Sequence, residues 1–158
     1  MRTARLRAAF VAATAVWAAL LVVAPFLASR AHASTMASAV IIGVYGIGSL
    51  VCHQLPERSY HLWTAQMPVC ARCAGIYLGA AIAAVGARAA HAGGMRLTLA
   101  TGRVRALIGV AVAPTLATLA YEWSTGDMPS HAIRAVAGLP IGLAVAWLVV
   151  GAADNQVD

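Results

Sequence analysis

The sequence predicts an all-α fold, a polytopic transmembrane bundle of about five helices. Composition is the first reason: hydrophobic residues make up 61% of the 158 residues and charged residues 10%, whereas soluble domains have about 45–50% and 25%. The second reason is that five nearly uncharged runs are separated only by short polar segments. Backbone in lipid must satisfy its own hydrogen bonds, and helices do so. We therefore expect a single integral membrane domain, residues 1–158.

The five runs differ in length. A hydrocarbon core of about 30 Å needs about 20 helical residues, so the first and fifth runs can span it and the second nearly can. The uncharged parts of the third and fourth runs are shorter. These two helices cross only if Arg72 and Glu122 at their ends lie at membrane depth or snorkel from it. The expected helices lie near residues 8–27, 34–51, 68–87, 106–122 and 135–153.

The first run has a second interpretation. Three arginines precede it, and Ala31-His32-Ala33 follows it in the small-x-small pattern of a signal-peptidase site. The apolar part of a signal peptide is usually about 7–15 residues long, whereas this run is long enough to remain as a helix. Both interpretations give a basic cytoplasmic start, from which the first run leads outward and the second run leads back.

The order of the helices decides which loops share a side. Helices three and four form a hairpin, so the segments Cys52–Cys73 and Glu122–Arg134 should face the same compartment. The positive-inside rule does not choose the side, because the arginines divide six against five. Since the first helix usually dominates, we expect Cys52–Cys73 on the cytoplasmic face of a multi-pass protein of the cell membrane. The six are Arg2, Arg5, Arg7, Arg58, Arg72 and Arg134, and the five are Arg30, Arg88, Arg96, Arg103 and Arg105.

The segment CHQLPERSYHLWTAQMPVCARC holds all three cysteines. Cys70 and Cys73 are three residues apart, so that their thiols can close on one ion or on each other. Pro68 is a favourable helix start. Both thiols would then lie in the first turns of the third helix, where the helix dipole and the neighbouring Arg72 favour thiolate.

A metal site needs further ligands, and the sequence offers them nearby. Cys52 and His53 end the second helix, and His61 is a substitute for His53 as fourth ligand. This soft set suits zinc or another soft divalent metal in a tetrahedral site. Adjacent residues rarely serve one ion, so that His53 is also a candidate for orienting a ligand instead. Covalent haem is not expected, because Ala74 follows Cys73 where the haem motif has histidine.

Two other functions stay open at this point. A membrane thiol oxidoreductase would use Cys70 and Cys73, and a structural subunit of a membrane complex would use the cysteines only as small buried side chains. The odd number of cysteines argues against a simple structural disulfide. We also expect four supporting residues, since charges in an apolar setting need partners: Arg72 should pair with Glu122 directly or through Arg134 or Asp127, and Arg58 lies in the same segment.

The remaining patterns concern packing and partners. Gly75-x-x-x-Gly79 and Gly138-x-x-x-Gly142 allow helix backbones to approach closely, within the chain or in an oligomer. The net charge of +6 comes from arginines scattered at helix ends, where the lipid bilayer and its anionic headgroups are the natural partners. Nucleic acid is therefore not an expected partner.

Residues Val51 to Gly79 resemble an uncharacterised family of small bacterial and archaeal membrane proteins, domain of unknown function 2085. The resemblance implies a polytopic membrane protein with a cysteine–histidine motif and supplies no substrate. A weaker likeness continues through Arg134, Gly138 and Gly142, but this chain has Glu122 where such proteins often have aspartate. The matching positions are Cys52, His53, Gln54, Pro56, Arg58, Ser59, Pro68, Cys70, Arg72, Cys73, Gly75, Ile76, Tyr77 and Gly79.

Overall fold

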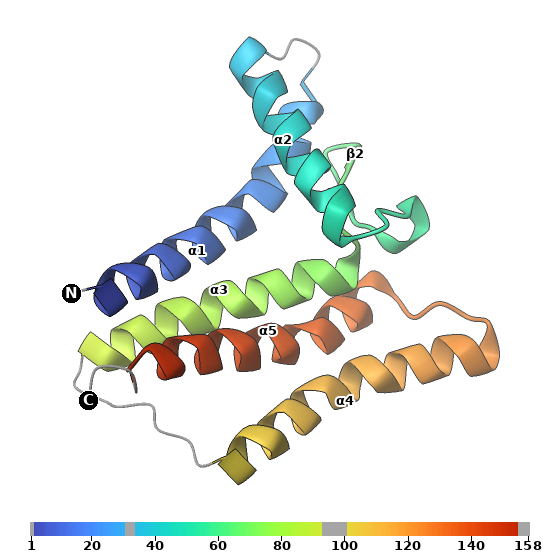
Figure 1. Ribbon diagram of the computed structural model, residues 1–158. Coiled ribbons are helices and arrows are strands. Elements are labelled where there is room, and N and C mark those ends of the chain that lie inside the picture. Colours follow the sequence, from blue (N-terminus) through green and yellow to red (C-terminus); the bar gives the residue numbers. More distant parts are fainter. Residues whose placement is uncertain (1, 31–33, 93–100, 155–158) are drawn as a thin grey trace.

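The computed structural model describes residues 2–30, 34–92 and 101–154, so Ala31-His32-Ala33 and Arg96 lie outside the described residues. Within these ranges it is a bundle of helices with one short β-hairpin (Figure 1). Four of the helices, all except α2, are long and apolar enough to cross a membrane by length and composition, which confirms the predicted fold class. The helices are α1 (Arg2–Ala28), α2 (Thr35–Val51), α3 (Ala71–Ala92), α4 (Thr101–Thr125) and α5 (His131–Asp154).

Helices α3 and α5 lie side by side and run in the same direction (Figure 1). Their backbones are in contact: a Cβ atom added to Gly75 would lie 1.9 Å from the carbonyl oxygen of Ala135, and one added to Gly142 would lie 1.8 Å from that of Ile76. The predicted packing role of both glycine motifs is therefore confirmed. Both glycine faces are filled within one chain, and an oligomer stays a prediction that would need other faces. Gly79 and Gly138 approach Leu139 and Arg72 in the same way.

Helix α4 returns in the opposite direction and packs on α5, where the Thr115 hydroxyl donates to the carbonyl of Ala137 at 2.8 Å. The end of α4 therefore lies beside the starts of α3 and α5. The ion pair between Arg72 and Glu122 joins these segments directly. The prediction that the segments Cys52–Cys73 and Glu122–Arg134 share one side is thus confirmed.

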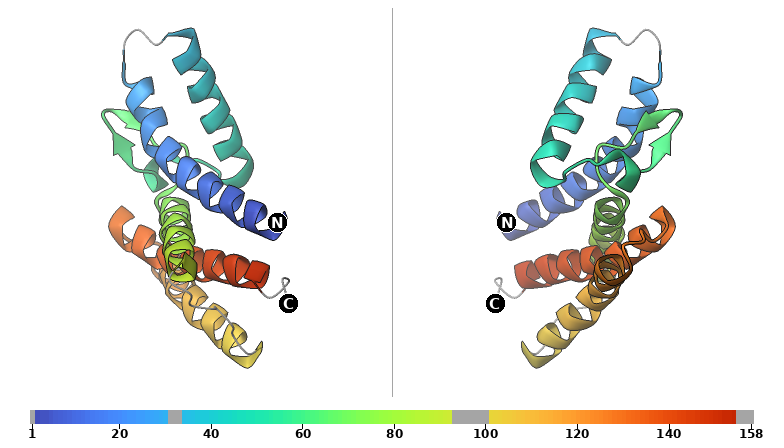
Figure 2. Two further views of the ribbon diagram at one scale, coloured as in Figure 1. Left: turned by 90° about the vertical axis from the view of Figure 1, so that its left-hand side faces the viewer. Right: turned by 90° about the vertical axis from the view of Figure 1, so that its right-hand side faces the viewer.

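Helix α1 runs antiparallel to α3. Val11 packs against Ala84 in the second half of α3, whereas Leu21 packs against Val69 just before α3 begins. The start of α1 consequently lies beside the ends of α3 and α5, far from the cysteine segment (Figures 1 and 2). The expectation that the second run crosses back to the side of the N-terminus is wrong. Helix α2, with 17 residues, instead folds back beside the last part of α1.

The segment between α2 and α3 contains one turn of 3-10 helix, Pro56–Arg58, and a hairpin of β1 (His61–Leu62) and β2 (Ala65–Gln66). The two turn residues, Trp63 and Thr64, have φ angles of 50° and 71°. Both lie in the left-handed region, which suits the right-handed twist of a hairpin but which glycine or asparagine normally supplies. The ring of Trp63 packs edge-on against that of Phe26 with centroids 5.2 Å apart, and this contact fixes the hairpin against α1.

Candidate metal centre

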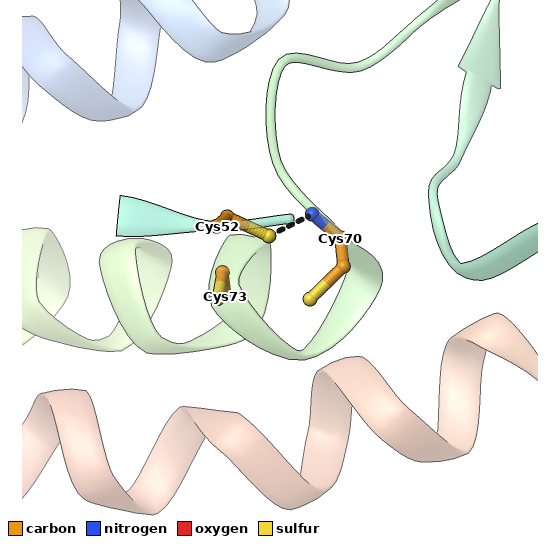
Figure 3. A group of neighbouring side chains, drawn as sticks. All are labelled: Cys52, Cys70 and Cys73. Carbon is orange, nitrogen blue, oxygen red and sulfur yellow. Dashed lines mark hydrogen bonds between the residues drawn. The ribbon is translucent and has the colours of Figure 1, made fainter. Parts of the chain in front are cut away.

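The three cysteines meet at the junction of α2 and α3, although Cys52 and Cys70 are 18 positions apart in the sequence (Figure 3). Cys52 caps the end of α2, its N–H donating to the carbonyl of Gly48. Cys70 directly precedes α3 and its carbonyl accepts the bond from Ala74 N–H at 2.9 Å, which leaves Cys73 in the first turn. All three Sγ atoms lie within 4.8 Å of one another and are partly buried.

Hydrogen bonds among the cysteines favour a thiolate. The backbone N–H of Cys70 donates to Sγ of Cys52 at 3.2 Å (Figure 3). The hydrogen bond from the Cys73 thiol is the main reason that the pKa of Cys70 is lowered to about 5, against burial, which raises it. Cys52 and the positive charge of Arg134 lower it further. The lowered pKa favours the thiolate form of Cys70.

Gln54 holds the end of α2 to the start of α3. Its Nε2 donates to the carbonyl of Tyr45 at 2.9 Å and to that of Pro68 at 2.7 Å, and its own carbonyl accepts from Nε2 of Gln66 at 2.5 Å. The backbone of Gln54 is left-handed, with φ of 50°. Gly48 permits this approach, because a Cβ there would lie 2.2 Å from the carbonyl oxygen of Pro68. The clamp therefore sets where Cys52 meets the residues before α3.

A buried ion network lies beside the thiols. Nη2 of Arg72 donates to Oε1 of Glu122 at 2.8 Å and to the hydroxyl of Thr118 at 3.1 Å, and Nε of Arg134 lies 3.3 Å from the same Oε1. The side chain of Arg72 is 12% exposed, that of Glu122 8% and that of Arg134 1%. The predicted pairing of Arg72 and Glu122 is confirmed, while Asp127 is exposed. Two cations share one anion, which leaves one excess positive charge.

The histidines occupy other places. His53 and His61 are both exposed, and neither belongs to the group of ligand atoms that the three cysteines form. A fourth protein ligand therefore stays a prediction. His131, at the start of α5, has its Nε2 atom 3.2 Å from the carbonyl oxygen of Glu57. The centroid of its ring lies 5.4 Å from that of Tyr60. Its contact fastens α5 to the segment between α2 and α3.

Two features of the centre were absent from the sequence expectations. Gln54 and Gly48 fix the geometry of the centre. The sequence indicates this role only through a polar amide that directly follows the Cys52-His53 pair in an apolar setting. The expected supporting residue Arg58 is partly buried, and its Nε has no hydrogen-bond partner within the described part of the chain. Its supporting role stays a prediction.

The separation of the sulfurs fits both metal binding and thiol redox chemistry. A zinc–sulfur distance of about 2.3 Å in tetrahedral geometry implies sulfurs about 3.8 Å apart, which a small closure of the present group reaches. All three thiols are free. Three protein ligands with an open position are typical of sites that exchange a ligand, whereas structural zinc sites have four.

The comparisons with known proteins agree with this architecture. Predicted membrane proteins with domain of unknown function 2085 match residues 52–148, more than half of the chain. An uncharacterized protein of Methanocaldococcus jannaschii is 43% identical over 56 residues, which are 35% of this chain and 36% of that protein. An uncharacterized protein of Methanothermobacter thermautotrophicus is 53% identical over 30 residues, 19% of this chain and 27% of its own.

These matches span about a third of each relative or less. No solved structure matches the chain. The family match begins at Cys52, the first of the clustered cysteines, and extends into α5, so that it includes all three thiols and the ion network. The chain therefore belongs to the DUF2085 family of predicted membrane proteins.

Proposed function

We propose that this membrane protein binds one soft divalent ion, zinc foremost, through the thiolates of Cys52, Cys70 and Cys73. The observation that supports this proposal most is the approach of three sulfurs within 4.8 Å from two separate segments. Isolated buried cysteines serve well as small apolar side chains, but that role gives no reason to gather every thiol of the chain. Thiolate ligands select soft and borderline ions such as zinc.

The charge beside the site favours a divalent ion over a monovalent one. Three thiolates around a divalent ion have a net charge of −1, and around a monovalent ion −2. The network of Arg72, Arg134 and Glu122 contributes one excess positive charge. Since uncompensated charge is costly in an apolar setting, the divalent complex is the better balanced.

An open fourth position suits acquisition or transfer of an ion more than permanent structural binding. A water molecule or a ligand from a donor can occupy it and leave again. His53 and His61 are the alternative occupants in this proposal, because each lies in a segment next to a cysteine. A histidine in that position would close the site and favour a structural or sensing role.

A membrane thiol oxidoreductase is the second candidate, and the lowered pKa of Cys70, to about 5, is the observation that favours it. The Cys70 thiolate would attack a substrate disulfide and form a mixed disulfide, expelling one substrate thiolate. Cys73 would then attack Sγ of Cys70 and release the second substrate thiol. Two protein thiols are oxidised to a disulfide, and one substrate disulfide is reduced to two thiols.

The direction of α1 also bears on orientation, and we propose that the cysteines face away from the cytoplasm. The end of the bundle opposite the cysteines, here called the basic end, has the described arginines Arg5, Arg7, Arg88, Arg103 and Arg105. The end with the cysteines, here called the cysteine end, has Arg30, Arg58, Arg72 and Arg134, of which the last two pair with Glu122. The positive-inside rule then places the basic end in the cytoplasm, opposite to the orientation expected from the sequence.

Metal content tests the main proposal. The protein, purified in mild detergent under reducing conditions without chelator, should contain about one zinc per chain, and Cys70→Ser should contain none. His53→Ala and His61→Ala are the matched controls, which keep the metal unless one of them supplies the fourth ligand. Absence of stoichiometric metal, together with a Cys70–Cys73 disulfide after mild oxidation, would replace this proposal with the oxidoreductase.

Labelling tests the orientation. In a background with serine at the three cysteine positions, single probes Ser124→Cys and Gly102→Cys lie at opposite ends of α4. A membrane-impermeant thiol reagent added to intact cells should modify Ser124→Cys and should reach Gly102→Cys only after the cells are opened. The reverse pattern would return the cysteines to the cytoplasmic side.

A further inference from the structure

The basic end contains a large apolar cavity between α3, α4 and α5, here called the α4 groove. Its volume is about 830 Å³, within the range of about 300–1,000 Å³ usual for ligand sites. Helix α4 packs on α5 and makes little backbone contact with α3. Small residues such as Gly86, Ala106 and Ala111 leave the space open. The larger lining side chains include Ile82, Leu107, Val110, Leu143 and Trp147.

One charged residue borders this apolar cavity. Of the described residues that line it, Arg103 has a charge and none is acidic. Arg103 is exposed in the first turn of α4, at the end of the bundle where Arg88 and Arg105 are also exposed. The groove therefore combines an apolar interior at membrane depth with a cation at its mouth.

We propose that the α4 groove binds an anionic phospholipid, with an acyl chain in the apolar interior and the headgroup phosphate on Arg103. The lining residues belong to three helices that are apolar enough to cross a membrane, so an occupant would enter from the bilayer. Basic pockets between membrane helices favour anionic headgroups. A phospholipid without net charge offers the same acyl chain but brings a cation to the same mouth. This inference does not depend on the proposed metal site.

Binding of defined lipids to the purified full chain tests the proposal. We expect native mass spectrometry to retain one phosphatidylglycerol per chain more strongly than one phosphatidylcholine, and phosphatidylglycerol to raise the thermal midpoint in neutral detergent. Arg103→Gln should weaken phosphatidylglycerol binding about fivefold, the effect of losing about one arginine contact with an anionic headgroup. Arg105→Gln is the matched control, because Arg105 is exposed two residues away and does not line the groove.

A second variant tests the interior separately from the charge. Ala106 is exposed in the groove, so Ala106→Phe should fill part of it and reduce retention of both lipids while Arg103 stays. Equal retention of the two lipids, with no change in Arg103→Gln, would overturn the proposal. So would a disulfide between Val110→Cys residues of two chains in lipid vesicles, because another copy of the chain would then occupy the groove.

Discussion

The cysteine end and the basic end of the bundle are held together in different ways. At the cysteine end, Gln54 bonds two separate segments, Glu122 bridges two buried arginines, and Cys70 N–H reaches the sulfur of Cys52. At the basic end the helices spread around a cavity of about 830 Å³, and Arg5, Arg88, Arg103 and Arg105 are exposed. Fixed geometry is thus concentrated where the thiols lie.

The difference between the two ends matters because of the way in which helices associate in a bilayer. Lipid tails are as apolar as leucine side chains, so helices in a bilayer associate through close packing and polar contacts rather than through the hydrophobic effect. The cysteine end has both kinds of contact. Among the described residues the basic end has fewer polar contacts between helices, and lipid can fill its cavity at little cost. The following predictions test whether the two ends differ in this way.

Removing the shared carboxylate should have the largest effect. Glu122→Gln leaves Arg72 and Arg134 buried without their anion, and breaking a buried ion pair typically costs about 3–5 kcal/mol. We expect a large fall in the free energy of unfolding in detergent. Arg103→Gln at the basic end, measured without added anionic lipid, should change it by no more than about 0.5 kcal/mol, as surface substitutions usually do.

Glu57→Gln controls for the loss of a carboxylate at the same end, because Glu57 is exposed. It should also stay within about 0.5 kcal/mol of the wild type. If Glu122→Gln and Glu57→Gln are tolerated equally, the ion network does not stabilise the cysteine end and the contrast between the ends loses its main support.

The contact between α3 and α5 should be the next most sensitive. Gly142→Ala places a Cβ 1.8 Å from the carbonyl oxygen of Ile76, so the two backbones must separate, and overpacking of this kind typically costs about 1–3 kcal/mol. Gly109→Ala in α4 is the control, since a Cβ there meets nothing within 4 Å. It should be neutral or stabilise the helix by up to about 1 kcal/mol. Thermal unfolding of both variants in one detergent gives the comparison.

Loss of the Gln54 amide should weaken the metal site without unfolding the bundle. Gln54→Gly accepts the left-handed backbone at position 54 but removes both bonds to carbonyl oxygens, and the loss of groups that support ligands commonly costs about 10–100-fold in metal affinity. Competition with a chelator measures this affinity. Gln54→Asn also tolerates a left-handed backbone and has a shorter amide. Unchanged metal affinity in both variants would show that the hydrogen bonds of Gln54 do not support the metal site.

The smallest effect concerns the pH at which Cys70 reacts. With a pKa of about 5, its alkylation rate should stay nearly constant from pH 8 to about pH 6 and fall only as the pH drops through about 5, because the thiolate is the nucleophile. Cys73→Ala removes the main hydrogen-bond donor, so the pKa should rise and the rate at pH 6 should fall. Mass spectrometry of peptides after timed labelling resolves the three cysteines.

The same pKa predicts the number of protons that metal binding releases. Because the lowered pKa favours the thiolate form of Cys70, binding by three thiolates should release fewer than three protons per ion at pH 7. Affinity should fall as the pH falls, since protons compete with the metal. Calorimetry in buffers of different ionisation enthalpy counts these protons, and a value of three would contradict the thiolate state of Cys70.

Hydropathy predicted all five helices. Most of their ends lie a few residues farther out than expected, whereas α2 and α3 begin slightly later. The expected fourth helix near 106–122 is Thr101–Thr125 in the structure, because Arg103 and Arg105 continue the helix while their side chains snorkel. Hydropathy does not indicate in which direction a helix runs, however, and so it could not predict that α1 runs antiparallel to α3. The hairpin was also unpredictable, since Trp63 and Thr64 stand where glycine or asparagine would mark a left-handed turn.

The spacing in the sequence correctly predicted that the three cysteines lie together. The histidine expected beside them is not part of the group. Cys52 has an extended backbone, with φ of −149° and ψ of 140°, and successive side chains of extended backbone point to opposite sides. Cys52 therefore faces Cys70 while His53 is exposed. The clamp by Gln54 depends on contacts across 9 and 14 residues, which a motif read along the chain does not reveal.

The glycine contacts between α3 and α5 also restrict how the protein can move. A slide of one helix along the other would need backbone approaches at Gly75, Gly79, Gly138 and Gly142 to open together. The two helices therefore behave as one rigid body, and that body includes Cys70, Cys73 and Arg134 at one end. Any conformational cycle of this protein must be a displacement of α1 and α2, or of α4, against a fixed frame. A displacement of α1 and α2 would withdraw Cys52, which lies at the end of α2, from the other two cysteines.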